Sequence, residues 1–151
     1  MAAHSYAVTV EADVFIARQA AERLASAEGF QRLAAQEVAL IVSELAWNIL
    51  RHAGGGRIDM SVVSDPRHGL ALEIRAFDPK PPIADLALAQ RDGHTAGGPI
   101  PPGAMLHRRG IGSGLGAVAR LGDRLVQEPH ASGGKCLVVT RYRVRPRPAP
   151  G

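Results

Sequence analysis

Cysteine, aromatic residues and long apolar runs are scarce in this sequence of 151 residues. The single cysteine, Cys136, excludes a disulfide within the chain and fits a reducing compartment. No apolar run approaches the roughly 20 residues that a membrane-spanning helix needs, and the first residues lack the basic and apolar segments of a secretory leader. We therefore expect a cytoplasmic protein with no membrane partner.

Clusters that would bind nucleic acid or zinc are also lacking. Lys and Arg number 18 against 14 Asp and Glu, and part of this excess lies in residues 141–151. Such a tail can contact acidic partners or nucleic acid, but no aromatic platform or basic helix accompanies it. The six histidines lack zinc-ligand spacing. We predict no nucleic-acid partner, and nucleic-acid binding through the tail stays the least favoured alternative.

The composition that remains is that of one globular domain, with 46% hydrophobic and 21% charged residues. Hydrophobic periodicity and turn residues divide the chain into elements. We expect strands at 5–10, 57–65, 70–78, 124–128 and 136–144, helices at 12–29, 30–53 and 83–92, and a helix that follows a glycine cluster and ends near 123. Residues 93–110 are too rich in Gly and Pro for regular structure, and we predict a long loop of the lid or binding type. The fold class is α/β (α+β), with helices on one face of a mixed, mainly antiparallel sheet.

The long helix over residues 30–53 carries polar groups along one flank of an otherwise apolar surface. At about 100° per residue, one apolar stripe holds Val38, Ile41, Val42, Leu45 and Ile49. The flank holds Glu37, Glu44, Asn48 and Arg51, and Glu44 and Asn48 lie one turn apart. A proton acceptor beside a neutral oxygen ligand is what metal-assisted phosphoryl transfer needs. The alternative is a solvated flank in which Glu44 pairs with Arg51.

Four alternating glycines, Gly110, Gly112, Gly114 and Gly116, precede the next predicted helix. Successive glycines free backbone N–H groups to surround an anion, and a helix N-terminus adds partial positive charge. The cluster is neither a Walker A loop nor a dinucleotide fingerprint. By composition it is a phosphate cradle, and the alternative is a flexible turn before a helix.

Together, SELAWNILRHAGGG and RRGIGSGLGAVARLGD, separated by a strand hairpin ending in FD, resemble the N, G1 and G2 boxes of the GHKL ATPases. The similarity runs from about residue 10 to 143 and is greatest to the RsbT-like anti-sigma regulatory serine/threonine kinases. It implies a two-layer, Bergerat-type ATP-binding fold over residues 1–143, with a flexible Arg/Pro-rich tail at 144–151.

The resemblance also implies roles for individual residues. It assigns Glu44 as the general base, Asn48 as the Mg²⁺ ligand and Asp78 as the acceptor for the adenine amino group. Phosphate contacts would come from the lid and the following helix, at Gly110, Gly112, Gly114, Leu115 and Gly116. The implied cofactors are ATP and Mg²⁺.

Three departures from the family pattern fall on the adenine side and the lid. The G1 box, normally Asp-x-Gly-x-Gly, reads Asp78-Pro79-Lys80-Pro81-Pro82 here. The late Gly-Thr pair that supports the adenine appears as Lys135-Cys136. The lid contains PIPPGAMLHRR and is longer than that of the RsbT-like group. The catalytic and phosphate half therefore keeps the pattern, while the adenine half is altered.

The function that the resemblance implies is a regulatory serine/threonine kinase in an anti-sigma, stress-response partner-switching system. Its substrate would be a Ser or Thr of a STAS-type antagonist protein, and a phosphatase or a sigma factor would be a further partner. The alternative is a degenerate module that binds a STAS or phosphatase partner without ATP turnover. The altered G1 box favours this alternative.

Overall fold

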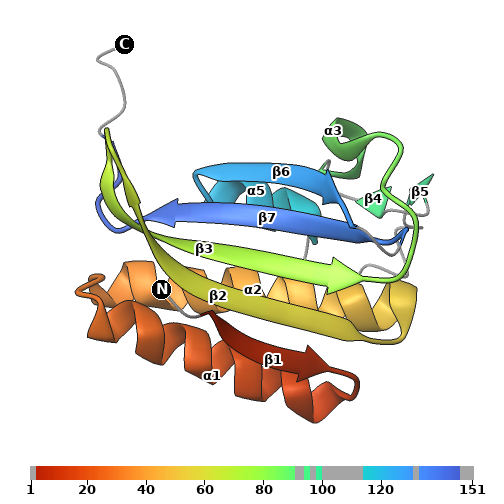
Figure 1. Cartoon of the computed structure of the whole chain (residues 1–151), viewed down its shortest axis with the longest axis horizontal. Coiled ribbons are helices and arrows are strands. Elements are labelled where there is room, and N and C mark those ends of the chain that lie inside the picture. The colour runs from red at the N-terminus through yellow and green to blue at the C-terminus, as the bar shows by residue number, and fades with distance from the viewer. Residues whose placement is uncertain (1–2, 91–93, 96–97, 100–113, 131–132, 147–151) are drawn as a thin grey trace.

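A five-stranded sheet with helices on one face forms the body of the chain (Figure 1). The computed structural model describes residues 3–90, 94–95, 98–99, 114–130 and 133–146. In chain order its elements are β1 (His4–Val8), α1 (Glu11–Ala27), α2 (Arg32–Ala53), β2 (Gly56–Asp65), β3 (Gly69–Asp78), α3 (Leu86–Ala89), β4 (His94–Thr95), β5 (Gly98–Pro99), α5 (Leu115–Leu121), β6 (Arg124–Pro129) and β7 (Lys135–Tyr142).

The sheet order is β1-β2-β3-β7-β6, and each neighbouring pair is antiparallel. The predicted class is confirmed, and the sheet is antiparallel throughout the described strands rather than mixed. Strand β7 returns beside β3, so that Lys135 pairs with Asp78 and Tyr142 with Ala71. Because side chains alternate along a strand, Asp78 and Lys135 point to the same face of the sheet. That face is the one covered by helices, since Ile74 and Ala76 on the same side of β3 belong to the core.

Helix α2 packs against the sheet and is the central element of the core. Thirteen of its residues are buried, including the apolar stripe predicted from periodicity. The helix ends before Gly54, whose φ of 74° is the left-handed conformation that favours glycine at this position. An 18-residue window of α2 has a mean hydropathy of 1.3, so this helix of 22 residues has the length and composition of a membrane span, although charged and polar residues interrupt its apolar run. In the domain, 67% of that stretch is buried, as in the core helix of a folded domain.

Helix α1 lies beside α2 and buries a row of small residues against it, which lets the two helices approach closely. The row consists of Val14, Ala17, Ala21 and Ala25. At its N-terminus, Asp13 Oδ2 accepts hydrogen bonds from the backbone N–H groups of Thr9 at 2.9 Å and Val10 at 3.1 Å. These bonds use backbone donors that precede the helix and fix the turn between β1 and α1.

Several boundaries differ from those expected. Within the predicted loop, His94–Thr95 and Gly98–Pro99 pair as the two short strands β4 and β5. The prediction of no regular structure there was wrong for these four residues, because a two-residue ladder needs few backbone donors and Pro occupies its second strand. Helix α3 covers only Leu86–Ala89, and α5 begins at Leu115. The rest of the predicted lid and the end of the tail lie outside the described residues.

Candidate functional site

Glu44 and Asn48 are buried polar residues on α2, with 2% and 5% of their surfaces exposed. They lie four residues apart, so their side chains neighbour each other on the helix surface. Buried polar side chains are costly unless a protein group, a ligand or water completes their bonding. The burial of both residues argues against a solvated flank, and their roles toward a ligand stay a prediction.

The flank that carries Glu44 and Asn48 has, at Glu37, a connection to the C-terminal end of α5. Glu37 lies on the same flank, and its Oε1 accepts a hydrogen bond from Arg141 Nη2 at 3.2 Å. Arg141 Nη1 also donates to the carbonyl oxygen of Leu121, the last residue of α5, at 2.8 Å. Helices α2 and α5 also pack directly against each other. The C-terminal end of α5 thus lies near Glu37, and its N-terminal end points toward the other end of the sheet.

The N-terminus of α5 carries the second half of the predicted glycine cluster. Gly114 precedes the helix with a φ of 58°, where a side chain would be strained. Leu115 and Gly116 follow as buried first residues of the helix. Gly110 and Gly112, which complete the predicted cradle, lie outside the described residues. The described glycines support the predicted turn into a helix, and the phosphate contacts stay a prediction.

Asp78 ends β3 and is buried, but its carboxylate already has two donors. Lys135 Nζ donates to Asp78 Oδ1 at 2.9 Å, and only 3% and 4% of the Lys135 and Asp78 side chains are exposed. The backbone N–H of Lys80 donates to the same oxygen at 2.8 Å. Lys80 itself is exposed. The carboxylate predicted to accept the adenine amino group is therefore held in an internal ion pair.

The backbone around Asp78 is fixed by close approaches from both sides. A Cβ on Gly56 of β2 would overlap the carbonyl oxygen of Phe77, and one on Gly134 would overlap that of Asp78. The substituted G1 segment is fixed at its far end, where Gln127 of β6 accepts from Ile83 N–H at 2.8 Å and donates to Ile83 O at 3.0 Å. These contacts leave the Asp78 carboxylate little freedom to move.

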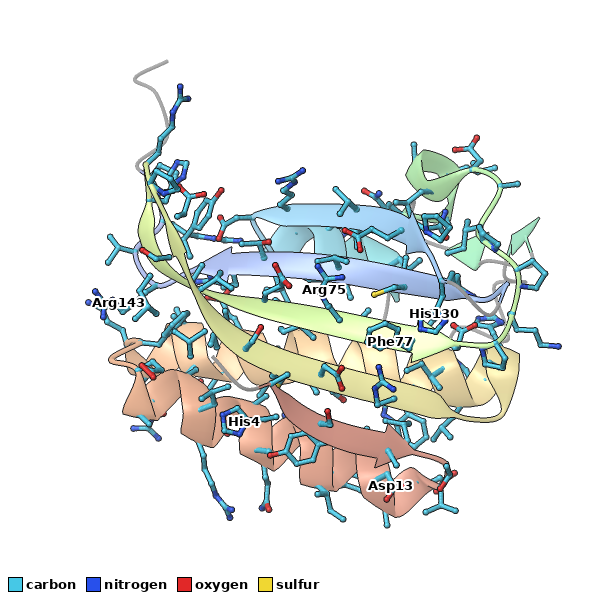
Figure 2. All side chains as sticks on the ribbon, in the orientation of Figure 1. His4, Asp13, Arg75, Phe77, His130 and Arg143 are labelled. Atoms are coloured by element: carbon cyan, nitrogen blue, oxygen red, sulfur yellow. The ribbon has the colours of Figure 1, made fainter. Side chains whose placement is uncertain are left out.

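The open face of the sheet carries separate chemistry. Figure 2 shows Phe77 and His130 beside each other at the end of β3. Their ring centroids lie 5.2 Å apart. A pocket of about 220 Å³ lies there, and the Arg57 guanidinium stacks over Phe77 at 4.3 Å. Cys136 faces this side, where burial raises the pKa of its thiol. The two residues that stand in place of the late Gly-Thr pair therefore face opposite sides of the sheet: Lys135 faces the helices and Cys136 faces the open side.

A divalent cation at this site would depend on few protein ligands. No group of three or more His, Cys, Asp or Glu side chains gathers among the residues that the structure describes. Asn48 offers one neutral amide oxygen, and Mg²⁺ characteristically combines one or two protein ligands with phosphate oxygens and waters. The residues present thus fit a cation that arrives with a nucleotide.

Comparison with known proteins decides the family. Residues 8–141 match the family described as "Histidine kinase-like ATPase domain". The chain belongs to this family. It is also 34% identical over 116 residues to "Serine/threonine-protein kinase RsbT" of Bacillus subtilis (strain 168), across 77% of this chain and 78% of that protein. The recognition made from the sequence motifs is confirmed. Membership of the histidine kinase-like ATPase family implies ATP binding.

Two residues important to this histidine kinase-like ATPase domain escaped sequence reasoning. Lys135 was noted as a departure, but its partner Asp78 lies 57 positions away and is reached only through the β3–β7 register. Gln127 lies 44 positions from Ile83 and appeared only as part of a strand. A buried lysine at the start of an apolar strand was the one signal available, since buried ammonium groups are nearly always paired.

Proposed function

We propose that the chain is an ATP- and Mg²⁺-dependent regulatory serine/threonine protein kinase. Its place would be in an anti-sigma, stress-response partner-switching system of the cytoplasm, and its substrate a Ser or Thr hydroxyl on a STAS-type antagonist. The observation that carries the proposal is the buried pair Glu44 and Asn48 on α2, the helix against which α5 packs. The relationship to a protein named as a serine/threonine kinase supports the reaction class.

The roles follow from the chemistry of the side chains. Glu44 would accept the proton of the attacking hydroxyl, and its burial keeps the carboxylate close to the reacting atoms and away from bulk water. Asn48 would hold Mg²⁺ through its amide oxygen, and because this ligand is neutral, the cation keeps its charge for the phosphates. Mg²⁺ supplies neutralisation of the charge that develops on the transferred group. Gly114, Leu115 and Gly116 would present the N-terminus of α5 to the phosphates, with Gly110 and Gly112 from the lid.

A second candidate function is a module that binds a STAS or phosphatase partner without ATP turnover. The ion pair between Asp78 and Lys135 favours it, because an ammonium now lies beside the carboxylate that ATP recognition would use. The Pro and Lys residues of the G1 segment add to this argument. The burial of Asn48 beside Glu44 argues for the kinase, because a nucleotide and its cation would give both polar side chains a function.

Phosphoryl transfer separates the two functions. The purified chain is incubated with γ-labelled ATP, Mg²⁺ and the STAS-domain proteins of the organism that makes it. A kinase labels one of these on Ser or Thr, and Glu44→Gln lowers the rate by about 100-fold or more while ATP binding persists. The matched control is Glu22→Gln on the exposed face of α1, which keeps the rate. ATP binding without transfer to any STAS protein would favour the non-catalytic module.

A further inference from the structure

Asp78 and Lys135 form a buried ion pair at one end of the domain. The described part of the chain buries two carboxylates, Glu44 on α2 and Asp78 at the end of β3. Glu44 belongs to the phosphate end of the proposed site. Asp78 is therefore the buried carboxylate that could contact the purine ring of a nucleotide. Its Oδ1 accepts from both Lys135 Nζ at 2.9 Å and Lys80 N–H at 2.8 Å.

The chemistry of this pair offers a nucleotide base both an acceptor and a donor. Adenine presents an amino donor at position 6, which a carboxylate oxygen accepts. Lys80 N–H and Lys135 Nζ both donate to Asp78 Oδ1, so Oδ2 can still accept that amino group. The Lys135 ammonium, 2.9 Å from Oδ1, has further N–H donors, which an oxo group at position 6 accepts. Neither base requires the ion pair to break.

The strand geometry makes the pair a fixed part of the fold. Asp78 and Lys135 are direct cross-strand partners in the β3–β7 ladder. Gly56 and Gly134 pack backbone against backbone on both sides of the end of β3. These contacts fix the backbones of Asp78 and Lys135, and the cost of separating a buried ion pair favours keeping the two side chains together when a ligand arrives.

We propose that Lys135 is a specificity-determining residue that removes selectivity for the adenine amino group from the nucleotide site. The site then takes purine nucleoside triphosphates with a 6-oxo group as readily as those with a 6-amino group. This inference rests on the proposed function, since it concerns the base end of the same ATP site. It accounts for a chain that keeps Glu44 and Asn48 while its adenine side is rebuilt.

The test compares ATP with inosine triphosphate, which differs by replacement of the 6-amino by a 6-oxo group. Dissociation constants are measured by calorimetry with Mg²⁺ for the wild type and for Lys135→Thr. The wild type binds the two triphosphates within about threefold of each other. Lys135→Thr frees the Asp78 carboxylate and prefers ATP by about tenfold or more.

The chain offers a matched control, because Lys80 and Lys135 are its two lysines. Lys80→Thr removes the same charge in the same neighbourhood and leaves the ATP to inosine triphosphate ratio near that of the wild type. The double variant Asp78→Asn/Lys135→Thr carries no buried charge at this point and should bind the two triphosphates alike, since an amide can turn either its oxygen or its nitrogen to the base. If Lys135→Thr fails to fold, the wild-type ratio still decides, because a tenfold preference for ATP overturns the inference.

The outcomes separate this inference from the proposed function. A tenfold or greater preference of the wild type for ATP overturns the inference, and so does an unchanged ratio in a folded Lys135→Thr protein. Equal binding of both triphosphates without phosphoryl transfer from either supports the inference and overturns the kinase. Failure to bind either triphosphate overturns the inference together with the ATP site.

Discussion

Arg141 on β7 connects Glu37 of α2 with the last residue of α5. Its Nη2 donates to Glu37 Oε1 at 3.2 Å, and its Nη1 donates to Leu121 O at 2.8 Å. The Arg141 side chain is 5% exposed and the Glu37 side chain 23%, so the guanidinium lies in the interior while Glu37 keeps some contact with water. Since α2 carries Glu44 and Asn48 and α5 begins at the glycine cluster, this arginine sets the spacing of the two helices that form the site.

Arg141→Met should therefore destabilise the fold. The variant leaves the Leu121 carbonyl without its donor and Glu37 without its cation, which we expect to lower the free energy of unfolding by about 2–4 kcal/mol. Denaturant unfolding measures the change. Arg124→Met on exposed β6 is the matched control and should stay within about 0.5 kcal/mol of the wild type. Equal stability of the two variants would contradict the role assigned to Arg141.

The Asp78–Lys135 pair predicts unequal lysine reactivity. Lys80 is exposed, whereas the Lys135 side chain is 3% exposed and bonded to a carboxylate. Acetylation of the native protein, followed by peptide mass spectrometry, should modify Lys80 readily and leave Lys135 largely unmodified until denaturant is added. Asp78→Asn should raise the reactivity of Lys135. Equal modification of both lysines in the native protein would show that the pair is open in solution.

The role proposed for Asn48 predicts that its substitution weakens ATP binding only when Mg²⁺ is present. Asn48→Ala removes the amide oxygen proposed to ligate Mg²⁺, and we expect ATP affinity in the presence of Mg²⁺ to fall by about tenfold or more. With the chelator EDTA present, the variant and the wild type should bind ATP alike, because no cation is then shared. Asn48→Asp, which retains an oxygen ligand, is the conservative control. A defect of equal size with and without Mg²⁺ would indicate loss of packing instead.

We predict that the stability contributed by Asp13 at the start of α1 is lost in acid. Hydrogen bonds from Thr9 N–H and Val10 N–H hold the pKa of Asp13 below the usual 3.8. The folded protein therefore favours the ionised form, so this contribution to stability is fully present above pH 3.8 and is lost as the pH falls through the lower folded pKa. Asp13→Asn should lower the thermal midpoint at pH 7, and the difference from the wild type should shrink in acid. A difference that does not change with pH would rule out this role for the ionised carboxylate.

We predict that the thiol of Cys136 reacts slowly with alkylating reagents. Burial raises its pKa, so the thiolate that reacts with alkylating reagents is scarce near neutral pH. Iodoacetamide at pH 7.5 should label the native protein far more slowly than the protein in denaturant, as read by intact mass. Rapid labelling of the native protein would show that the open face of the sheet exposes this position.

The sequence predicted those parts of the molecule that depend on local periodicity. The flank of α2 with Glu37, Glu44 and Asn48 follows from a 3.6-residue repeat, so its polar residues were found together. The left-handed end of that helix at Gly54 follows from the preference of this conformation for glycine. These features involve neighbours a few positions apart and need no knowledge of the fold.

What depended on strand register could not be predicted. The partner of Asp78 is decided by the placement of β7 beside β3, and a shift of one residue would turn Lys135 to the open face and Cys136 to the helix side. The bonds of Gln127 to Ile83 likewise require β6 to lie at the sheet edge beyond β7. The short ladder of β4 and β5 was missed because Gly and Pro around it indicate a loop.

Calorimetric titration of the wild type with Mg·ATP tests most directly whether the buried flank of α2 holds a nucleotide. We predict saturable binding with a dissociation constant below about 1 mM, weakened by Asn48→Ala only when Mg²⁺ is present. Absence of binding heat, together with an unchanged unfolding temperature at millimolar Mg·ATP, would contradict the proposed nucleotide site.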